Sequence, residues 1–228
     1  MRIVEGADLR GPLRREGRVV LEDLELRRCY FEGAFLERSE TAAERPLVRN
    51  VTLTGCAQRG CTIDGAIVED VRVDGLKSST LLQTWAAAFR HVALRGRVGR
   101  WMFSNLVSPL AAPAQQHDFD RANQAFYAST DWALDISEAE FTECDIRGIP
   151  APLIRRDPAT QAVVTREKAL QGGWERLDLS RTYWPTAIRF LLQQGHADVV
   201  LVAPKRSRNF TVLLDGLKML RDAGVAEL

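Results

Sequence analysis

A five-residue hydrophobic register runs through the first half of the chain. Residues 19–38 divide into units of five, each with an apolar residue at its first position and a larger one at its third. Such a register turns apolar side chains to one side at regular intervals, which is typical of short, successive strands. The third positions of these units are Leu21, Leu26, Phe31 and Leu36.

A longer period lies over the first. The register breaks at the polar residues 39–45 and resumes at Pro46. Similar units then recur about every 20 residues, which is the signature of a repeat that buries its apolar side chains against its neighbours. Four units per 20 residues indicate a four-sided coil in which like positions stack. The matching first and third positions are Leu24/Leu26, Val51/Leu53, Val71/Val73 and Val92/Leu94.

These positions define the predicted interior. The first position takes small side chains and includes every cysteine, while the third takes large ones. We therefore expect a structural core made by Leu21, Leu26, Cys29, Phe31, Leu36, Leu53, Cys56, Cys61, Ile63, Val68, Val73, Phe89, Leu94, Phe141, Cys144 and Ile146.

The units resemble the pentapeptide-repeat family, whose pattern is Ala-(Asp/Asn)-Leu-x-x. Ala139-Glu-Phe141 and Cys144-Asp-Ile146-Arg-Gly fit this pattern, and the resemblance covers roughly residues 19–105 and 132–148. It implies a mainly β fold, a right-handed parallel β-helix (quadrilateral solenoid) with a narrow interior. It says little about function, because the repeats of this family are structural. The chain departs from the pattern at the third positions Gln58, Ser78 and Gln83.

The cysteines are explained by packing. Free cysteine behaves as a small buried hydrophobe, and the N-terminus has no secretory signal that would favour disulfides. Cys56 and Cys61 lack a nearby His or further Cys to complete a metal site. We therefore expect no metal and no cofactor.

Charge and hydropathy bear on possible partners and on the cellular location. The chain has 31 Lys+Arg and 30 Asp+Glu, so no global field favours nucleic acid. No apolar run approaches the roughly 20 residues that span a bilayer. We expect a cytoplasmic protein without a membrane segment.

Two regions depart from the register. Residues 106–131 interrupt it with Pro109 and Pro113, and we expect a loop with one short helix there. After Pro150 and Pro152 the composition changes. The predicted organisation is therefore a β-helix over residues 1–150, with the loop excursion at 106–131, and an α/β region over 151–228 that caps the coil or forms a homodimer.

The tail has recognisable helix and strand signals. We expect a helix over 159–171, a second helix that opens at Pro185 and ends at Gly195, a strand over 198–203 and a third helix over 210–223.

The sequence contains candidate binding residues and no signal for an enzyme. A strand followed by a basic loop and a helix suggests phosphate capture, but the loop lacks the glycines of a phosphate-binding motif. The three histidines, at 91, 117 and 196, are dispersed, and no nucleophile motif occurs. The candidate partner-binding residues are Lys205, Arg206 and Arg208 in the tail and Asp118, Asp120 and Arg121 in the excursion, with a solvated surface as the alternative for each group.

The fold class favours binding over catalysis. The first hypothesis is a non-enzymatic binding protein whose rigid β-helix engages a protein partner, of the scaffold, immunity or target-protection type. The alternative is a C-terminal α/β module that binds a phosphorylated ligand or nucleic acid through Lys205, Arg206 and Arg208. A purely structural role in a larger assembly stays open.

Overall fold

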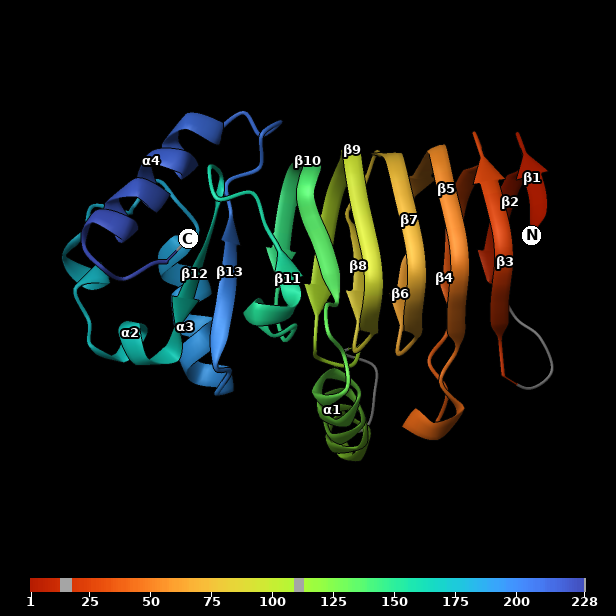
Figure 1. Ribbon diagram of the computed structural model, residues 1–228, viewed down its shortest axis with the longest axis horizontal. Coiled ribbons are helices and arrows are strands. Elements are labelled where there is room, and N and C mark those ends of the chain that lie inside the picture. Colours follow the sequence, from red (N-terminus) through yellow and green to blue (C-terminus); the bar gives the residue numbers. More distant parts are fainter. Residues whose placement is uncertain (13–17, 109–112, 228) are drawn as a thin grey trace.

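The protein is an elongated stack of strands with helices at one end and on one side (Figure 1). A computed structural model describes residues 1–12, 18–108 and 113–227. The first part of the chain forms β1 (Arg2–Glu5), β2 (Asp8–Pro12), β3 (Val20–Arg27), β4 (Tyr30–Leu36), η1 (Ala42–Glu44), β5 (Leu47–Arg59), β6 (Thr62–Asp64), β7 (Ile67–Ser78), β8 (Leu82–Trp85), β9 (Ala88–Ser104), α1 (Pro113–Ala128) and β10 (Leu134–Ile146). The rest forms η2 (Ala151–Leu153), β11 (Ile154–Arg155), β12 (Gln161–Thr165), α2 (Arg166–Leu170), η3 (Trp174–Arg176), α3 (Trp184–Gln194), β13 (Asp198–Val202) and α4 (Phe210–Asp222).

Parallel pairing closes the strands into a ring. In order around it, β5 pairs with β4, β4 with β6, β6 with β8, β8 with β9, β9 with β7, and β7 with β5. The described strands therefore form a closed six-stranded parallel barrel, and β1, β2, β3 and β10 extend it as extra strands.

The predicted right-handed parallel β-helix (quadrilateral solenoid) is wrong in this respect. β5 and β9 are 13 and 17 residues long and continue through several bends. β5 pairs with β7 over Leu47–Gln58 and with β4 over Ala57–Arg59, so one strand joins two neighbours and the ring closes. A five-residue period marks where the chain bends. It does not reveal whether hydrogen bonding stops at a bend or continues through it.

The registers themselves are confirmed. Leu24 lies beside Val51, Val51 beside Val71, and Val71 beside Val92, as the 20-residue period predicts. The bends fall at fifth positions, where Asp23, Asn50, Asp70 and His91 have left-handed backbone angles. Short polar side chains tolerate this conformation, and glycine occupies many of the other bends. The register also extends to the N-terminus, because β2 pairs with β4, a region outside the residues that carried the prediction.

Most of the expected core lies inside the barrel. Buried side chains include those of Leu26, Cys29, Leu36, Cys56, Cys61, Val68, Val73, Phe89, Leu94, Phe141 and Ile146. Partly buried ones are Leu21, Phe31, Leu53, Ile63 and Cys144. The four cysteines are free, as expected, but Cys144 is half-buried and lies at the barrel's outer edge.

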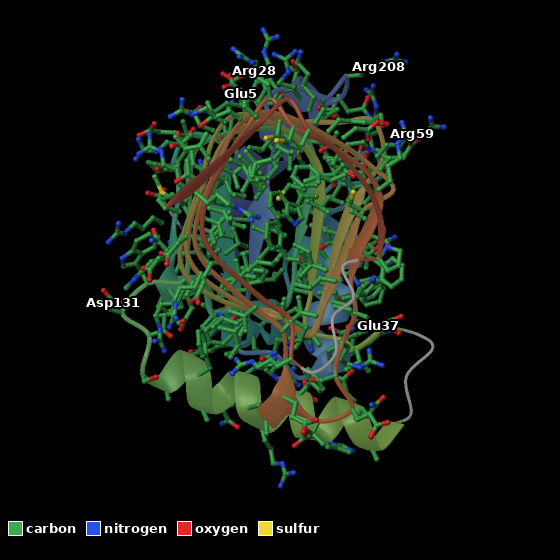
Figure 2. The ribbon with its side chains drawn as sticks, turned by 90° about the vertical axis from the view of Figure 1, so that its right-hand side faces the viewer. Glu5, Arg28, Glu37, Arg59, Asp131 and Arg208 are labelled. Atoms are coloured by element: carbon green, nitrogen blue, oxygen red, sulfur yellow. The ribbon has the colours of Figure 1, made fainter. Side chains whose placement is uncertain are left out.

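The excursion is a helix and not chiefly a loop. α1 is 16 residues long and lies against the outside of the barrel (Figures 1 and 2). Arg45, at the end of the polar insertion, holds it there. The Arg45 side chain is buried, with guanidinium N–H groups donating to Gly65 O (3.0 Å), Ala86 O (3.0 Å) and Asn123 Oδ1 (2.7 Å). Its guanidinium also lies 5.1 Å from the centroid of the Phe119 ring.

The C-terminal region forms a second, smaller core. β12 and β13 pair antiparallel, and α2, α3 and α4 pack on them around Trp174, Leu201, Leu213 and Leu217. The other face of these two strands presents Val163, Val200 and Val202 to the barrel's hydrophobic cluster.

The tail predictions have mixed outcomes. The helix opened by Pro185 and ended by left-handed Gly195 is confirmed, as are the strand from Asp198 and the helix from Phe210. The helix over 159–171 is wrong in its first half, which is β12. Ala162, Val163 and Val164 are all buried, and a β-branched run between two cores favours a strand.

Within the described ranges, no helix has both the length and the apolar character required to cross a membrane. The same residues contain no group of three His, Cys, Asp or Glu side chains placed to hold a metal ion.

Candidate binding cleft

A cleft of about 650 Å³ separates the end of the barrel from the C-terminal region. Strand β13 forms a β-pairing with β10 at a single residue pair, Ile146 and Val200. Further along β10, the backbone N–H of Arg206 donates to Phe141 O at 3.0 Å. Between these two points, among the described residues, the segment 142–145 makes no pairing with β13. The outer edge of β10 is therefore open toward the cleft.

Aromatic side chains from α3 line one wall. Pro185 starts the helix in its first turn, which places Tyr183 and Trp184 at its N-terminal end. Trp184 is buried, and its indole N–H donates to Leu213 O at 3.1 Å. Tyr183 is 57 % exposed although it is a large apolar side chain, and Phe190 lies about two helical turns further along on the same face. Exposed aromatics beside a cleft are typical of binding surfaces.

Three arginines surround the cleft, and two of them are paired. Arg100 Nε donates to Glu143 Oε2 at 2.8 Å, and Arg147 Nε donates to Asp145 Oδ1 at 3.1 Å. The Arg147 guanidinium also lies 4.3 Å from the centroid of the Phe190 ring. Arg208 also lines the cleft, has no ion pair among the described residues, and extends outward from the molecule in Figure 2. The cleft therefore carries one positive charge that is not offset.

Cys144 lines the cleft without the properties of a nucleophile. Burial raises the pKa of its thiol well above the ordinary value, and the nearby Asp145 and Glu143 raise it further. The thiolate is the reactive form of cysteine. Cys144 therefore contributes a neutral, polarisable surface.

The three cations of the basic loop, Lys205, Arg206 and Arg208, differ in their ion pairing. Lys205 Nζ lies 2.9 Å from Asp157 Oδ2, and Arg206 lies 3.6 Å from Glu140 Oε2. Both cations are thus offset by carboxylates, whereas Arg208 lines the cleft and has no ion-pair partner in the described chain.

The excursion candidates lie elsewhere. Asp118 Oδ2 accepts a hydrogen bond from the Ala42 backbone N–H at 2.7 Å, so it ties α1 to η1 of the polar insertion. Arg121 is exposed and lies 3.6 Å from Asp118. Asp120 accepts from Gln116 at 2.7 Å and, with His196, lines a separate cleft of about 730 Å³. The two predicted groups are therefore not brought together.

Several cleft residues were missed by sequence reasoning. Tyr183, Phe190, Arg100 and Arg147 come from three elements that are far apart in the chain. Their only sequence signal is the aromatic pair immediately before Pro185, which an N-terminal helix start also explains.

Comparisons with protein-family models, with curated proteins and with solved structures found no match. The resemblance to the pentapeptide-repeat family therefore stays a prediction.

Proposed function

We propose that this protein is a non-enzymatic binding protein that holds an extended, acidic segment of a partner protein in the cleft between β10 and β13. The observation that carries the proposal is the open edge of β10 at residues 142–145, which lines the same cleft as exposed Tyr183 and unpaired Arg208.

Main-chain hydrogen bonding supplies the first part of the recognition. An extended peptide can add a strand to an open sheet edge, where backbone bonds provide affinity. Four residues of strand span about 13 Å at roughly 3.3 Å per residue, enough for a short segment. The edge ends at the Ile146–Val200 pair and at the Arg206–Phe141 bond, so the geometry sets the length of the bound strand.

Side chains supply the second part. Tyr183 and Phe190 offer aromatic surface for one apolar side chain, and Cys144 adds a neutral contact. Arg208 offers a planar group of N–H donors that matches a carboxylate. A segment with an apolar residue and a nearby Asp or Glu therefore fits the cleft.

The basic-loop alternative receives less support. Two of its three cations are paired with Asp157 and Glu140, so the loop has little charge left to attract phosphates.

Peptide selection tests the proposal. Random twelve-residue peptides displayed on phage are selected against the full-length protein, and the affinity of the enriched peptides is measured by fluorescence polarisation. We expect sequences that combine an apolar and an acidic residue. Arg208→Glu should weaken their binding about tenfold or more, since it replaces attraction with repulsion. The control is Arg121→Glu, which changes another exposed arginine, outside the cleft.

A backbone test separates strand addition from side-chain contact alone. N-methylation of alternate peptide amides removes the donors that would face β10, whereas methylation of the amides in between spares them. Loss in only one of the two alternating series is expected. The proposal would be contradicted if the two sets of N-methylated peptides bound equally well. It would also be contradicted if Arg208→Glu and Arg121→Glu reduced the peptide affinity equally.

A further inference from the structure

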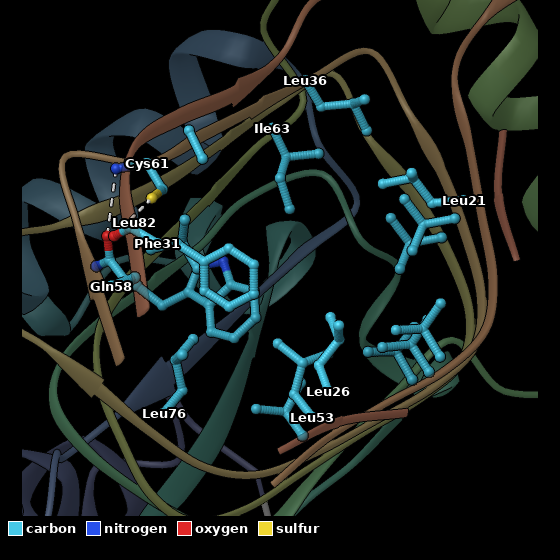
Figure 3. A pocket seen from close by; sticks show the side chains of 18 of the residues that line it. Leu21, Leu26, Phe31, Leu36, Leu53, Gln58, Cys61, Ile63, Leu76 and Leu82 are labelled. Atoms are coloured by element: carbon cyan, nitrogen blue, oxygen red, sulfur yellow. Dashed lines mark hydrogen bonds between the residues drawn. The ribbon is translucent and has the colours of Figure 1, made fainter. Parts of the chain in front are cut away.

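Further hollows lie outside the cleft between β10 and β13. One is a cavity of about 170 Å³ inside the barrel, beside Trp101, and its almost entirely apolar lining (Figure 3) does not select one occupant. Another is the cleft of about 730 Å³ that Asp120 and His196 line. Its size is typical of small-molecule sites. Its polar groups restrict the chemistry of a ligand, so it carries the argument further.

Three elements form this second cleft, which we call the α1 cleft. Helix α1 forms one wall, the chain that follows β10 forms the second, and the turn between α3 and β13 forms the third. Pro150, Pro152 and Leu153 give the second wall an apolar surface, to which Tyr127 adds from α1. Such a surface suits the methylene groups of a ligand.

Asp120 gives the α1 cleft a negative charge. Its Oδ1 accepts a hydrogen bond from Gln116 Nε2 at 2.7 Å, and its carboxylate has no ion pair among the described residues. No lysine or arginine is among the described residues that line the cleft. An unpaired carboxylate in a cleft without cations attracts positively charged ligands and repels anions.

His196 lines the third wall without a positive charge. Its Nε2 lies 2.9 Å from Gln194 Oε1, which can only accept, so Nε2 carries the proton of the neutral ring. Burial lowers the pKa of His196, and Arg147 lowers it further, while Asp120 and Asp198 raise it. The Asp120 carboxylate is therefore within electrostatic reach of the ring. At neutral pH the ring itself does not repel a cation.

We propose that the α1 cleft binds an alkylammonium group, either of a free diamine or of a lysine side chain. The ammonium group pairs with Asp120, and its alkyl chain lies against Pro150, Pro152 and Leu153. An ammonium group has three N–H donors and no acceptor, which matches a carboxylate beside the neutral His196 ring. A metal ion fits less well, because the described residues include no group of three ligating side chains.

Two ligands of equal length test the inference. Diaminopentane and pentanediol carry their functional groups at both ends of the same chain, but only the diamine is charged. We expect isothermal titration calorimetry with the full-length protein at neutral pH to show diamine binding, with the diol weaker by about tenfold or more. Salt should weaken the binding of the diamine, because it screens the charge of Asp120.

A third ligand identifies the source of the ammonium group. N-acetyl-lysine methylamide presents the side chain as a protein would. Binding of the diamine, of the lysine derivative or of both supports the inference, and their relative affinities distinguish a free amine from a lysine of a partner protein. Binding of neither would overturn it.

Variants of the cleft supply the second readout. Asp120→Asn removes the charge but keeps an acceptor for Gln116, and it should weaken diamine binding about tenfold or more. The control is Asp222→Asn, which changes another exposed carboxylate, outside the cleft. Ala128→Trp and Ala197→Trp fill the cleft from two exposed positions and should abolish binding. Circular dichroism shows whether each variant folds.

This inference and the proposed function can fail separately. Peptides selected for the cleft beside β10 should bind Asp120→Asn as they bind the wild type, and Arg208→Glu should leave diamine binding unchanged. The inference would be overturned if Asp120→Asn and Asp222→Asn weakened diamine binding equally. Binding that persists in both folded tryptophan variants would place the diamine elsewhere and would overturn it too.

Discussion

Single side chains decide how the excursion is attached, and Arg45 is the main one. Arg45 is 2 % exposed, and burial lowers the pKa of its guanidinium to about 10. The charge is held by two backbone carbonyls and Asn123, without a carboxylate within hydrogen-bonding distance in the described chain. A buried cation without an ion pair is stable only while each of its donors is bonded.

Arg45→Ala is expected to lower the free energy of unfolding by about 3 kcal/mol, because Gly65 O and Ala86 O each lose a donor that carried charge. Hydrogen exchange in α1 should rise as well. Urea denaturation and exchange mass spectrometry measure both effects. Arg49→Ala, at an exposed pair with Glu22, should cost less than about 1 kcal/mol. Equal losses for the two variants would show that Arg45 does not anchor the helix.

His91 is the second residue that links the excursion to the barrel. Its Nε2 lies 2.7 Å from Asp131 Oδ1 and its Nδ1 lies 3.0 Å from Asp70 Oδ1, at the point where the chain returns from α1 (Figure 2). The hydrogen bond with Asp131, followed by that with Asp70, raises the pKa of His91. The same bond lowers the pKa of Asp131.

The stability contributed by His91 should therefore depend on pH. A raised His pKa stabilises the fold below the unfolded value of about 6.5, and this contribution is lost as the pH rises through the folded pKa. The contribution is also lost when the pH falls below about 4, because Asp131 then becomes protonated and no longer pairs with His91. The variant His91→Asn tolerates the same left-handed backbone, as Asn50 does. The melting temperature difference between wild type and variant should be largest near pH 5–6 and shrink by pH 9. A constant difference from pH 5 to 9 would exclude this ion pair as its source.

At the scale of elements, the close approach of α1 to the barrel depends on a glycine. Gly65 has φ +67°, and a Cβ there would lie 2.7 Å from Phe119 Cε1 and 2.6 Å from Arg38 Cγ. Phe119 is fully buried and cannot turn away without moving the helix. Gly60 has nearly the same backbone angle, φ +64°, but a Cβ there meets nothing within 4 Å.

The two glycines form a matched pair for substitution. Gly60→Ala is expected to cost about 1 kcal/mol from left-handed strain alone. Gly65→Ala should cost about 2–3 kcal/mol more, because the clash displaces α1. Chemical denaturation of both variants gives the difference directly. Similar costs would mean that the helix adjusts freely, and the docking described for Arg45 would be looser than its hydrogen bonds indicate.

At the scale of the whole molecule, the C-terminal region covers the end of the barrel. Val163, Val200 and Val202 belong to the same hydrophobic cluster as Phe141 and Ile146 of β10. Strand β11 pairs with β10 as well. The two cores therefore share a boundary at which each buries the other's apolar side chains.

Removal of residues 151–228 should expose the end of the barrel. Each large apolar side chain uncovered costs about 1.5–3 kcal/mol, and an open strand edge promotes association. We expect the 1–150 fragment to elute as aggregates in size-exclusion chromatography, whereas the full-length chain carrying Tyr183→Ala elutes as the wild type does. A fragment that is monomeric and melts cooperatively would show that the barrel is stable without this cover.

The sequence predicted which side chains face inward, but it did not predict that the strands close into a barrel. The five-residue register places Leu26, Cys56 and Val73 inside, and the observed bends at Asp23, Asn50, Asp70 and His91 recur in the same register. These features depend on neighbours in the chain and on the alternation of side chains across a strand. Whether a strand continues through a bend depends on hydrogen bonds to residues about 20 positions away, and only the tertiary structure decided it.

The candidate sites follow the same division. Lys205, Arg206 and Arg208 were recognisable as a charged cluster, but their carboxylate partners, Asp157 and Glu140, are far away in the sequence. The cleft beside Tyr183 and the cavity beside Trp101 arise where separate elements meet, and no local pattern encodes them. The sequence alone therefore determined the period of the wall and the side chains that face inward, because both are short-range properties. The tertiary structure decided which strands close the barrel, which charges remain unpaired and where space is left, because these depend on contacts between distant residues.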